Sequence, residues 1–562
     1  MKKKYVTILL GIAVSVLYLG GCAEIEDFLE VQVKESRTEE SRTEESGTEE
    51  NRTEESGTEE SGTEESGTEE SRTRESRTEE GGTQESRREE DGKKEVRYQK
   101  VSAVPDEGGK GIGSAVAMVE PEDLEDGPAV EYYPAVAEYA VDMETEGETY
   151  ASKGTDENAV HILGEAQVVL RNAKMTRNSK TAGEEDYSAC GMGAALLTTS
   201  GTAYLKNNTI TVSADRGAGI FSYGDRSAVY AANTMVSTKS NASAGIRAAR
   251  GGSFYGWNLE VETEGRAAPA LRSDRRGGPL VVDGGTYTTR GADSPAVYSA
   301  GNTAVRNGTL TAEQWEAVCM EGNQSLYLYE CDVSGNKEDD ISNDCTWNVI
   351  IYQDRPNGTE MGHSTFEMNG GSLSAKNGGM FYTTNAESTI TLSDVDIMYP
   401  MINEFFLKCT GNNNQRGWGE RGANGARCLF TAVNQQMSGD VVWDSISELD
   451  FYMSGGSTLT GAVRKEENGA SGEGHCNLLI EEGCTWTVTG DSTLSRLSCP
   501  GTMVDDEGNT VTVRGNDGTV YIQGAGKYTV AVEVYEPMAN MSGASETTQW
   551  MEHQVEIPRE LQ

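Results

Sequence analysis

The sequence is poor in the patterns that build helices and common catalytic sites. It has only 12 Pro and 4 His, and the histidines are far apart: His161, His363, His475 and His553. No CxxC or HExxH motif occurs, which excludes a zinc ribbon and a helical zinc-protease site. Apolar residues at the 3.6-residue spacing of an amphipathic helix are scarce. We therefore assign no catalytic, cofactor-binding or metal-binding residue.

Positive charge is also scarce. Lys and Arg number 47 against 91 Asp and Glu, which gives a formal net charge of −44. Nucleic-acid binding needs Lys and Arg in excess to neutralise phosphates, and docking to anionic lipid needs the same. The charge excludes both classes of partner and is compatible with a soluble surface protein.

The number and spacing of the ten cysteines indicate that most of them are packed in the interior rather than paired in disulfides. If Cys22 is set aside for the reason given below, nine remain, and an odd number cannot all pair. Their spacings are irregular. We expect most of them to be small buried hydrophobic residues, and disulfide pairing of a few stays open.

The first residues have the form of an export signal. Lys2 to Lys4 precede an apolar stretch, residues 5–19, that is too short for a comfortable membrane span. It ends in Leu19-Gly20-Gly21-Cys22, which resembles the lipobox of bacterial lipoproteins. The resemblance implies that residues 1–21 are a signal peptide. Cys22 would carry the lipid and anchor the protein to the extracellular face of a bacterial cell membrane.

Residues 22–95 are expected to be a disordered, acidic tether. From Glu35 to Glu90 a five-residue unit repeats, as in "ESRTEESRTEESGTEE", with 21 Glu against 8 Arg. The repeats contain no aliphatic or aromatic residue that burial could use to offset the entropy of ordering. A poorly defined region and cap, residues 96–154, would follow the tether.

A repeat of about 25 residues indicates the fold of residues 155–536. A small residue followed by an aliphatic one recurs at steps of 24, 26, 25, 26 and 21 residues; the aliphatic positions are Leu196, Ile220, Ile246, Leu271, Val297 and Val318. Two further short strands follow each, and Asn or Gly marks the corner before the last one. Three strands per repeat predict an all-β, single-stranded parallel β-helix, in which each strand pairs with its counterpart in the next coil. Loop insertions are expected near 335–346 and 399–427, and a polar tail over 537–562.

Particular runs also carry a resemblance. "GGPLVVDGGTYTTRGADSPAVYSAGNTAVRNGTLTA", "STFEMNGGSL" and "TWTVTGDSTLSRL" resemble surface-exposed, adhesin-like lipoproteins of anaerobic Gram-positive bacteria with a pectin-lyase-like fold. The resemblance covers residues 155–515 and implies a right-handed β-helix. Little function comes with it, because the activity of that family is poorly defined.

Catalytic motifs of related folds are missing. The Asn-Thr-Asp, Gly-His-Gly and Arg-Ile-Lys motifs of polygalacturonases do not occur. The acidic pairs Asp339-Asp340 and Asp505-Asp506 fall in expected loops, where we interpret them as turn residues. Two carboxylates that act on one glycosidic bond must instead face each other across a groove.

Two places are candidates for ligand binding. Phe221, Arg247, Arg272 and Tyr298 fall on the outward position of successive coils, where rings and guanidiniums would grip an acidic sugar. Trp418, with Asn424, is the second candidate, in a glycine-rich loop.

We therefore expect a membrane-anchored, monomeric adhesin or glycan-binding module without catalysis. Its partner would be a glycan or a protein of the host or cell surface. The alternatives are a diverged polysaccharide lyase or hydrolase acting on acidic glycans, and a passive structural surface protein.

Overall fold

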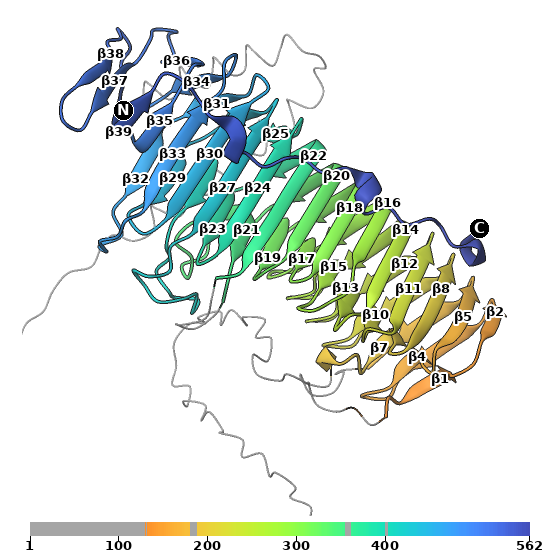
Figure 1. The fold of residues 1–562 in the computed structure, drawn as a ribbon. Coiled ribbons are helices and arrows are strands. Elements are labelled where there is room, and N and C mark those ends of the chain that lie inside the picture. The colour runs from red at the N-terminus through yellow and green to blue at the C-terminus, as the bar shows by residue number, and fades with distance from the viewer. Residues whose placement is uncertain (1–129, 131, 180–187, 355–360, 400–402) are drawn as a thin grey trace, which may run out of the picture. The chain divides into compact units, whose positions relative to one another are not determined.

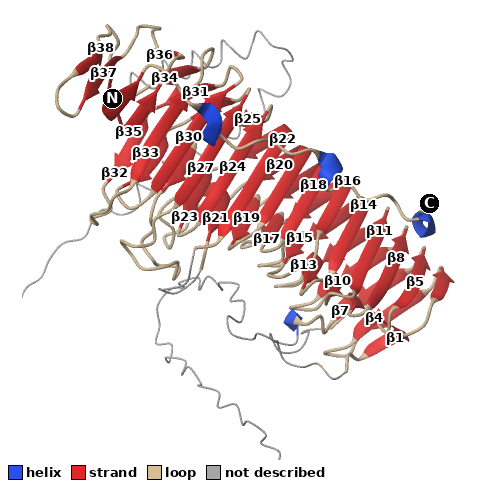
Figure 2. Ribbon diagram, viewed as in Figure 1, coloured by secondary structure: helices blue, strands red, loops and turns tan. Residues whose placement is uncertain are grey.

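A computed structural model describes residues 130, 132–179, 188–354, 361–399 and 403–562. This part of the chain is nearly all β, with the strands arranged in parallel sheets (Figures 1 and 2). No helix in it is long and apolar enough to cross a membrane. The expected lipidation site Cys22 and the tether 22–95 lie outside the described residues.

The first sheet has one strand from each of thirteen successive coils, and all its pairings are parallel. Its thirteen strands are, in spatial order, β1 (Ala135–Tyr139), β4 (Asn158–Ile162), β7 (Ala194–Thr198), β10 (Ala218–Tyr223), β13 (Ala244–Ala249), β15 (Leu271–Ser273), β17 (Val297–Ser299), β19 (Val318–Glu321), β21 (Trp347–Tyr352), β23 (Gly379–Thr384), β26 (Leu407–Cys409), β29 (Val441–Asp444) and β32 (Val463–Glu466). Spatial order therefore follows chain order, as in a solenoid.

The remaining strands form two further sheets. The second sheet holds β2 (Met143–Glu146), β3 (Thr149–Ser152), β5 (Ala166–Arg171), β6 (Lys174–Arg177), β8 (Gly201–Lys206), β9 (Thr209–Val212), β11 (Ser227–Ala232), β12 (Met235–Thr238), β14 (Ser253–Thr263), β16 (Leu280–Thr289), β18 (Asn302–Ala312), β20 (Ser325–Gly335), β22 (His363–Ala375), β24 (Glu387–Ser393), β25 (Asp396–Met398), β27 (Arg427–Val433), β30 (Glu448–Ser454), β33 (His475–Ile480), β35 (Ser492–Ser498), β37 (Thr512–Gly515), β38 (Val520–Ile522) and β39 (Thr529–Glu536). The third holds β28 (Gln436–Ser438), β31 (Thr458–Gly461), β34 (Thr485–Val488) and β36 (Thr502–Val504). Three short 3-10 helices, η1 (Met541–Gly543), η2 (Trp550–Glu552) and η3 (Arg559–Leu561), follow the last strand.

The register of the first sheet confirms the predicted aliphatic column. Ile220 pairs with Ile246, Ile246 with Leu271, and Leu271 with Val297. All four side chains are fully buried. Because the same residue type recurs at the same place in each coil, the interior fills by stacking like on like.

The corners also lie where the sequence predicts them. Asn207, Asn233, Asn258 and Asn307 all have φ between 50 and 58°, the left-handed conformation that Asn tolerates better than most residues. The side-chain amide of Asn258 donates to the Asn233 side chain of the previous coil at 2.9 Å. The corner residues therefore also link neighbouring coils.

Segments outside the expected β-helix join it. Strands β1, β2 and β3, within the 96–154 region, pair with β4, β5 and β6 of the next coil. Residues 336–346 connect β20 to β21 without strand structure, and the region 399–427 contains the short strand β26. Both loop regions leave the coil beside the first sheet.

The expected polar tail, residues 537–562, runs back along the second sheet, and we call it the C-terminal strap (Figure 1). The backbone N–H of Ser545 donates to Thr431 at 3.0 Å, and that of Thr548 donates to Glu367 at 2.7 Å. At its far end, the backbone carbonyl oxygen of Gln562 accepts from Lys206 at 2.7 Å. The strap thus contacts coils in the reverse of their chain order.

Trp550 is the main apolar anchor of the strap. Its side chain is 9% exposed and packs edge-on to Tyr329, with ring centroids 5.8 Å apart. The Arg306 guanidinium lies over the Trp550 ring at 4.9 Å. The next strap residue, Met551, is 75% exposed, so the two neighbours differ sharply in burial.

We expect Trp550→Ala to loosen the strap and leave the coils intact. Removing a buried aromatic side chain costs about 1.5–3 kcal/mol, which raises the open population of the strap about tenfold or more. A glutamate-specific protease should then cleave after Glu546 and Glu552 correspondingly faster, read by mass spectrometry. Met551→Ala is the matched control and should not change the rate. Equal rates for wild type and both variants would show that Trp550 does not hold the strap.

Candidate functional site

Four of the predicted ligand-binding residues form one ladder across the first sheet. Phe221 pairs with Arg247, Arg247 with Arg272, and Arg272 with Tyr298. The predicted alignment is therefore confirmed. The ladder is not an open stripe, because Phe221 is 1% and Tyr298 0% exposed.

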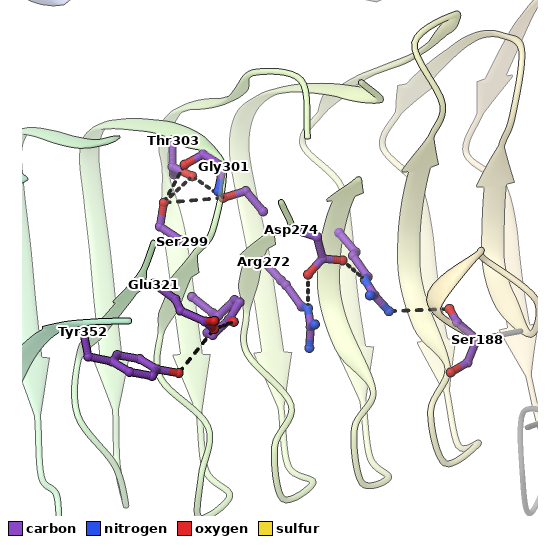
Figure 3. Close-up of polar contacts among 11 residues, drawn as sticks. Ser188, Arg272, Asp274, Ser299, Gly301, Thr303, Glu321 and Tyr352 are labelled. Atoms are coloured by element: carbon purple, nitrogen blue, oxygen red, sulfur yellow. Dashed lines mark hydrogen bonds and ion pairs between the residues drawn. The ribbon is translucent and has the colours of Figure 1, made fainter. Parts of the chain in front are cut away.

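The two arginines of the ladder share one carboxylate, that of Asp274 (Figure 3). Arg272 Nε donates to Asp274 Oδ1 at 2.5 Å, and Arg247 Nε donates to Asp274 Oδ2. Arg247 also lies over the Phe221 ring, and Arg272 over the Tyr298 ring, with the guanidinium carbon about 5 Å from the centroid in each case. Both guanidiniums are therefore held by the protein itself.

A second carboxylate, Glu321, continues this polar face (Figure 3). It is 1% exposed and accepts hydrogen bonds from Tyr298, Arg275 and, at 3.3 Å, Tyr352. Sequence reasoning missed both Asp274 and Glu321. The available signal was an acidic residue at the end of a first-sheet strand, beside the arginine ladder.

Asp274→Asn should destabilise the protein strongly. The substitution leaves Arg247 and Arg272, whose side chains are 13% and 12% exposed, without their shared counter-charge. Breaking a largely buried ion pair in this way costs about 3 kcal/mol of the free energy of unfolding. Urea unfolding followed by tryptophan fluorescence measures it. Glu262→Gln, which removes an exposed partner of Arg290, is the control and should cost less than about 1 kcal/mol. Similar losses for both variants would contradict this account of the ladder.

Trp418 lies further along the same sheet face. Its ring is 4.4 Å from that of Tyr352 and 6.2 Å from that of Trp347, between centroids. Trp418 and Tyr298 belong to one buried apolar cluster outside the coils. Trp418, the second predicted candidate, therefore lies near the Tyr298 end of the ladder. It is not part of the strand pairing that forms the ladder.

Two contacts fix the loop that carries Trp418. The Asn424 side chain is fully buried and donates to the backbone carbonyl oxygens of Asn412 and Trp418, both at 3.0 Å. Gly419 has φ +71°, and a Cβ there would lie 2.6 Å from Asn385 Oδ1. Only glycine fits this close approach without a shift of the neighbouring chain.

The facing loop, residues 336–346, is held by a buried ion pair. Lys337 Nζ lies 2.9 Å from Glu316 Oε2 and 4.7 Å from the Trp347 ring centroid. Burial lowers the pKa of Lys337, and the Glu316 carboxylate opposes that shift. The pair anchors the start of this loop beside the strand that carries Trp347.

A polar cleft, which we call the loop cleft, opens between these loops and the ends of β26, β29 and β32. Its volume is about 320 Å³, within the range of small-ligand sites. Polar and charged side chains dominate its lining: Asp344, Lys408, Thr410, Asn412, Asn413, Arg421, Asn424, Asp444, Glu466, Glu467 and Asn468. Trp418 lies beside it, on a smaller inner hollow that shares Asp344, Asn412 and Asn413 with the cleft.

Three buried polar side chains lie around the inner hollow. Within the described residues, Trp347 Nε1 has no hydrogen-bond partner, whereas the Tyr382 hydroxyl lies beside the hydroxyls of Thr384 and Thr410. Trp347, Tyr382 and Thr410 are each at most 2% exposed. An unpaired buried polar group costs about 1–3 kcal/mol, so an ordered water in the hollow would supply the missing partner of Trp347 Nε1.

The charged groups of the cleft are partly paired. Lys408 Nζ forms an ion pair with Glu466, and Asp444 Oδ2 accepts from the Gly411 N–H and the Asn468 amide, both at 2.8 Å. Beside the hollow, burial raises the pKa of Asp340, but hydrogen bonds from Ser342 and the charge of Arg416 outweigh it and hold the pKa below its usual value. Asp340 is therefore ionised at neutral pH, as a loop residue rather than a proton donor.

Neither metal chemistry nor relationship to known proteins identifies the site. Among the described residues, no three His, Cys, Asp or Glu side chains are grouped so that they could hold a metal ion. No protein family model and no curated protein matches the sequence. The assignment of a function therefore depends on the chemistry of the loop cleft itself.

The cysteines offer no activated nucleophile. All nine described cysteines are free thiols, and eight of them are buried. Burial raises the pKa of Cys331 and of Cys428 to about 12, and that of Cys499 to about 11. A raised pKa leaves little thiolate at neutral pH, and the thiolate is the reactive form.

We expect these nine thiols to react with iodoacetamide slowly at pH 8 in the folded protein and rapidly in urea. Unfolding opens access to the sulfur atoms and removes the burial that raises the pKa values of Cys331, Cys428 and Cys499. Mass spectrometry of peptides reads each cysteine separately. Rapid labelling of Cys331 or Cys428 in the folded protein would contradict this description.

Proposed function

We propose that this protein is a surface-anchored, right-handed parallel β-helix of about 25 residues per coil that binds a glycan in the loop cleft. The anchor would be a lipid on Cys22, and residues 22–95 would hold the folded part away from the extracellular face of the membrane. The resemblance of residues 155–515 to adhesin-like, pectin-lyase-like surface proteins supports this placement. We propose a monomer.

The observation that carries the proposal is the loop cleft itself, which has a volume of about 320 Å³ and a polar lining. A sugar hydroxyl both donates and accepts, so it suits a wall made of amide and charged side chains. The amides of Asn412, Asn413 and Asn468 supply donors and acceptors on that wall. The arginine ladder is less suited, because Asp274 already holds its guanidiniums.

Cleavage of the glycan is a second candidate. A polysaccharide lyase needs a basic group beside carboxylates, and Lys408, Glu466 and Asp444 all line the cleft. Release of unsaturated sugar ends from a bound glycan would identify this activity. Release of reducing ends would indicate a hydrolase.

Thr410→Val tests the site with little risk to the fold. The substitution keeps the shape and removes a buried hydroxyl whose polar neighbour is the Tyr382 hydroxyl, so the free energy of unfolding should fall by no more than about 1.5 kcal/mol. If that hydroxyl meets the ligand, glycan affinity should fall about fivefold, the value of one neutral hydrogen bond. Binding of the full chain to neutral, amino and acidic oligosaccharides measures this, in a detergent without a sugar headgroup.

Two controls accompany this variant. Thr309→Val makes the same change at an exposed position of the second sheet and should bind like wild type. The Arg247→Ala/Arg272→Ala double variant tests the ladder. If this double variant alone lost binding, the ladder would be the site; if no oligosaccharide bound the wild type, the proposed function would be wrong.

A further inference from the structure

We infer that the C-terminal strap is a clamp on the N-terminal coils. It binds along one outward column of the second sheet and ends on β5 and β8, so these first coils open only when the end of the strap is released. This role needs no ligand in the loop cleft and therefore goes beyond the proposed function.

The strap follows one register position of the second sheet. Glu367 pairs with Thr391, and Thr391 with Thr431, so the three side chains stand at the same place in successive coils. The Ser545 hydroxyl lies 2.7 Å from that of Thr391, and the Ser545 N–H donates to Thr431. Thr548 donates to Glu367 twice, through its N–H at 2.7 Å and its hydroxyl at 2.9 Å. Successive polar residues of the strap therefore bind successive coils.

The same column continues to small residues where Trp550 binds. Val281 pairs with Ala304, and Ala304 with Tyr327. Val281, Ala304 and Trp550 are buried together in one apolar cluster, which also holds Tyr329. Short side chains on two coils leave room for the indole, and the two tyrosines of the next coil flank it. An aromatic anchor in a site of matching size makes a specific contact, unlike a chain that only lies on the surface.

The far end of the strap is fixed to two of the first coils. Arg171 on β5 donates to the backbone carbonyl oxygen of Glu560 at 3.1 Å, and Lys206 on β8 donates to that of Gln562 at 2.7 Å. Leu561, between these two residues, is only 4% exposed, and η3 packs against β8. In Figure 1 the C-terminus accordingly lies at the end of the solenoid that holds β5 and β8.

These contacts bypass the order in which coils normally support one another. Each coil of a solenoid contacts only its neighbours, so the end coils are the least stable and open first. Within the described residues, β2 and β3 pair only with the coil that follows them. The strap joins this end directly to β20, β22, β24 and β27. Any pull on residues 1–129 also reaches the solenoid through these first coils.

Leu561→Ala tests the clamp at its far end. Loss of this buried side chain raises the open population of the strap end, so the amides of β2 and β5 should exchange about fivefold faster. Hydrogen exchange of the full chain, read by mass spectrometry of peptides, measures the rates. Ile557→Ala shortens a strap side chain that is 42% exposed and is the matched control; it should change the rates less than about twofold. Amides of β34, which belongs to a coil beyond the strap, serve as the internal reference.

A second pair of variants leaves the strap sequence unchanged. Lys206→Met removes the donor to Gln562 and keeps the aliphatic part of the side chain, so exchange in β5 should rise about threefold. Lys174→Met makes the same change at an exposed position of β6 and is the matched control.

Reciprocity separates a clamp from a segment that only rests on the sheet. If strap closure stabilises the first coils, stable first coils must stabilise strap closure to the same degree. Val168→Ala, at a fully buried position of β5, should therefore speed cleavage of the strap after Glu552 by a glutamate-specific protease about threefold or more. Val488→Ala makes an equally buried change in β34, beyond the coils that the strap contacts, and should not alter this rate.

Each measurement can overturn the clamp. Unchanged exchange of β2 and β5 in both Leu561→Ala and Lys206→Met would do so, as would equal acceleration in Leu561→Ala and Ile557→Ala. Acceleration that includes β34 would show a loss of overall stability instead of a local release. A strap cleavage rate that Val168→Ala leaves unchanged would show that the strap and the first coils are not coupled.

Discussion

Each strand pairs in register with its counterpart in the next coil, and this pairing determines which side chains face the interior and which face outward. A shift of one residue would turn the buried Ile220–Ile246–Leu271–Val297 column outward and bring the charged ladder inward. Backbone hydrogen bonds set the coil spacing, and stacked side chains and corner asparagines fix the register. Every outward position is therefore placed by a repeating, local rule.

The candidate binding site lies where loops interrupt the regular repeat of the coils. The loop 336–346 precedes β21 and the loop 410–426 follows β26. The two loops meet outside the first sheet, where Arg416 pairs with Asp340 and the Asn413 N–H donates to Asp344. Their backbones are held by Lys337 and Asn424, which are both buried. A rigid repeat thus presents an irregular, polar surface, as in many proteins that carry binding sites on loops.

The sequence allowed us to predict the features that recur in every coil, but not the contacts that occur only once. The aliphatic columns, the corners at Asn207, Asn233, Asn258 and Asn307, and the alignment of Arg247 with Arg272 follow from spacing. The capture of both arginines by Asp274 does not, because it depends on how side chains turn outside the coil. The position of the C-terminal strap could not be predicted from the sequence either. Its contact between Lys206 and Gln562 joins residues far apart in the chain, and no repeating pattern indicates it.

The proposed function depends on a glycan bound in the loop cleft. A crystal structure of the protein soaked with neutral, amino and acidic oligosaccharides would show where a sugar binds. We expect an ordered sugar in the cleft, with hydroxyl groups within hydrogen-bond distance of the side-chain amides of Asn412, Asn413 or Asn468. A sugar ordered elsewhere, on the arginine ladder or along the second sheet, with the cleft holding only water, would contradict it.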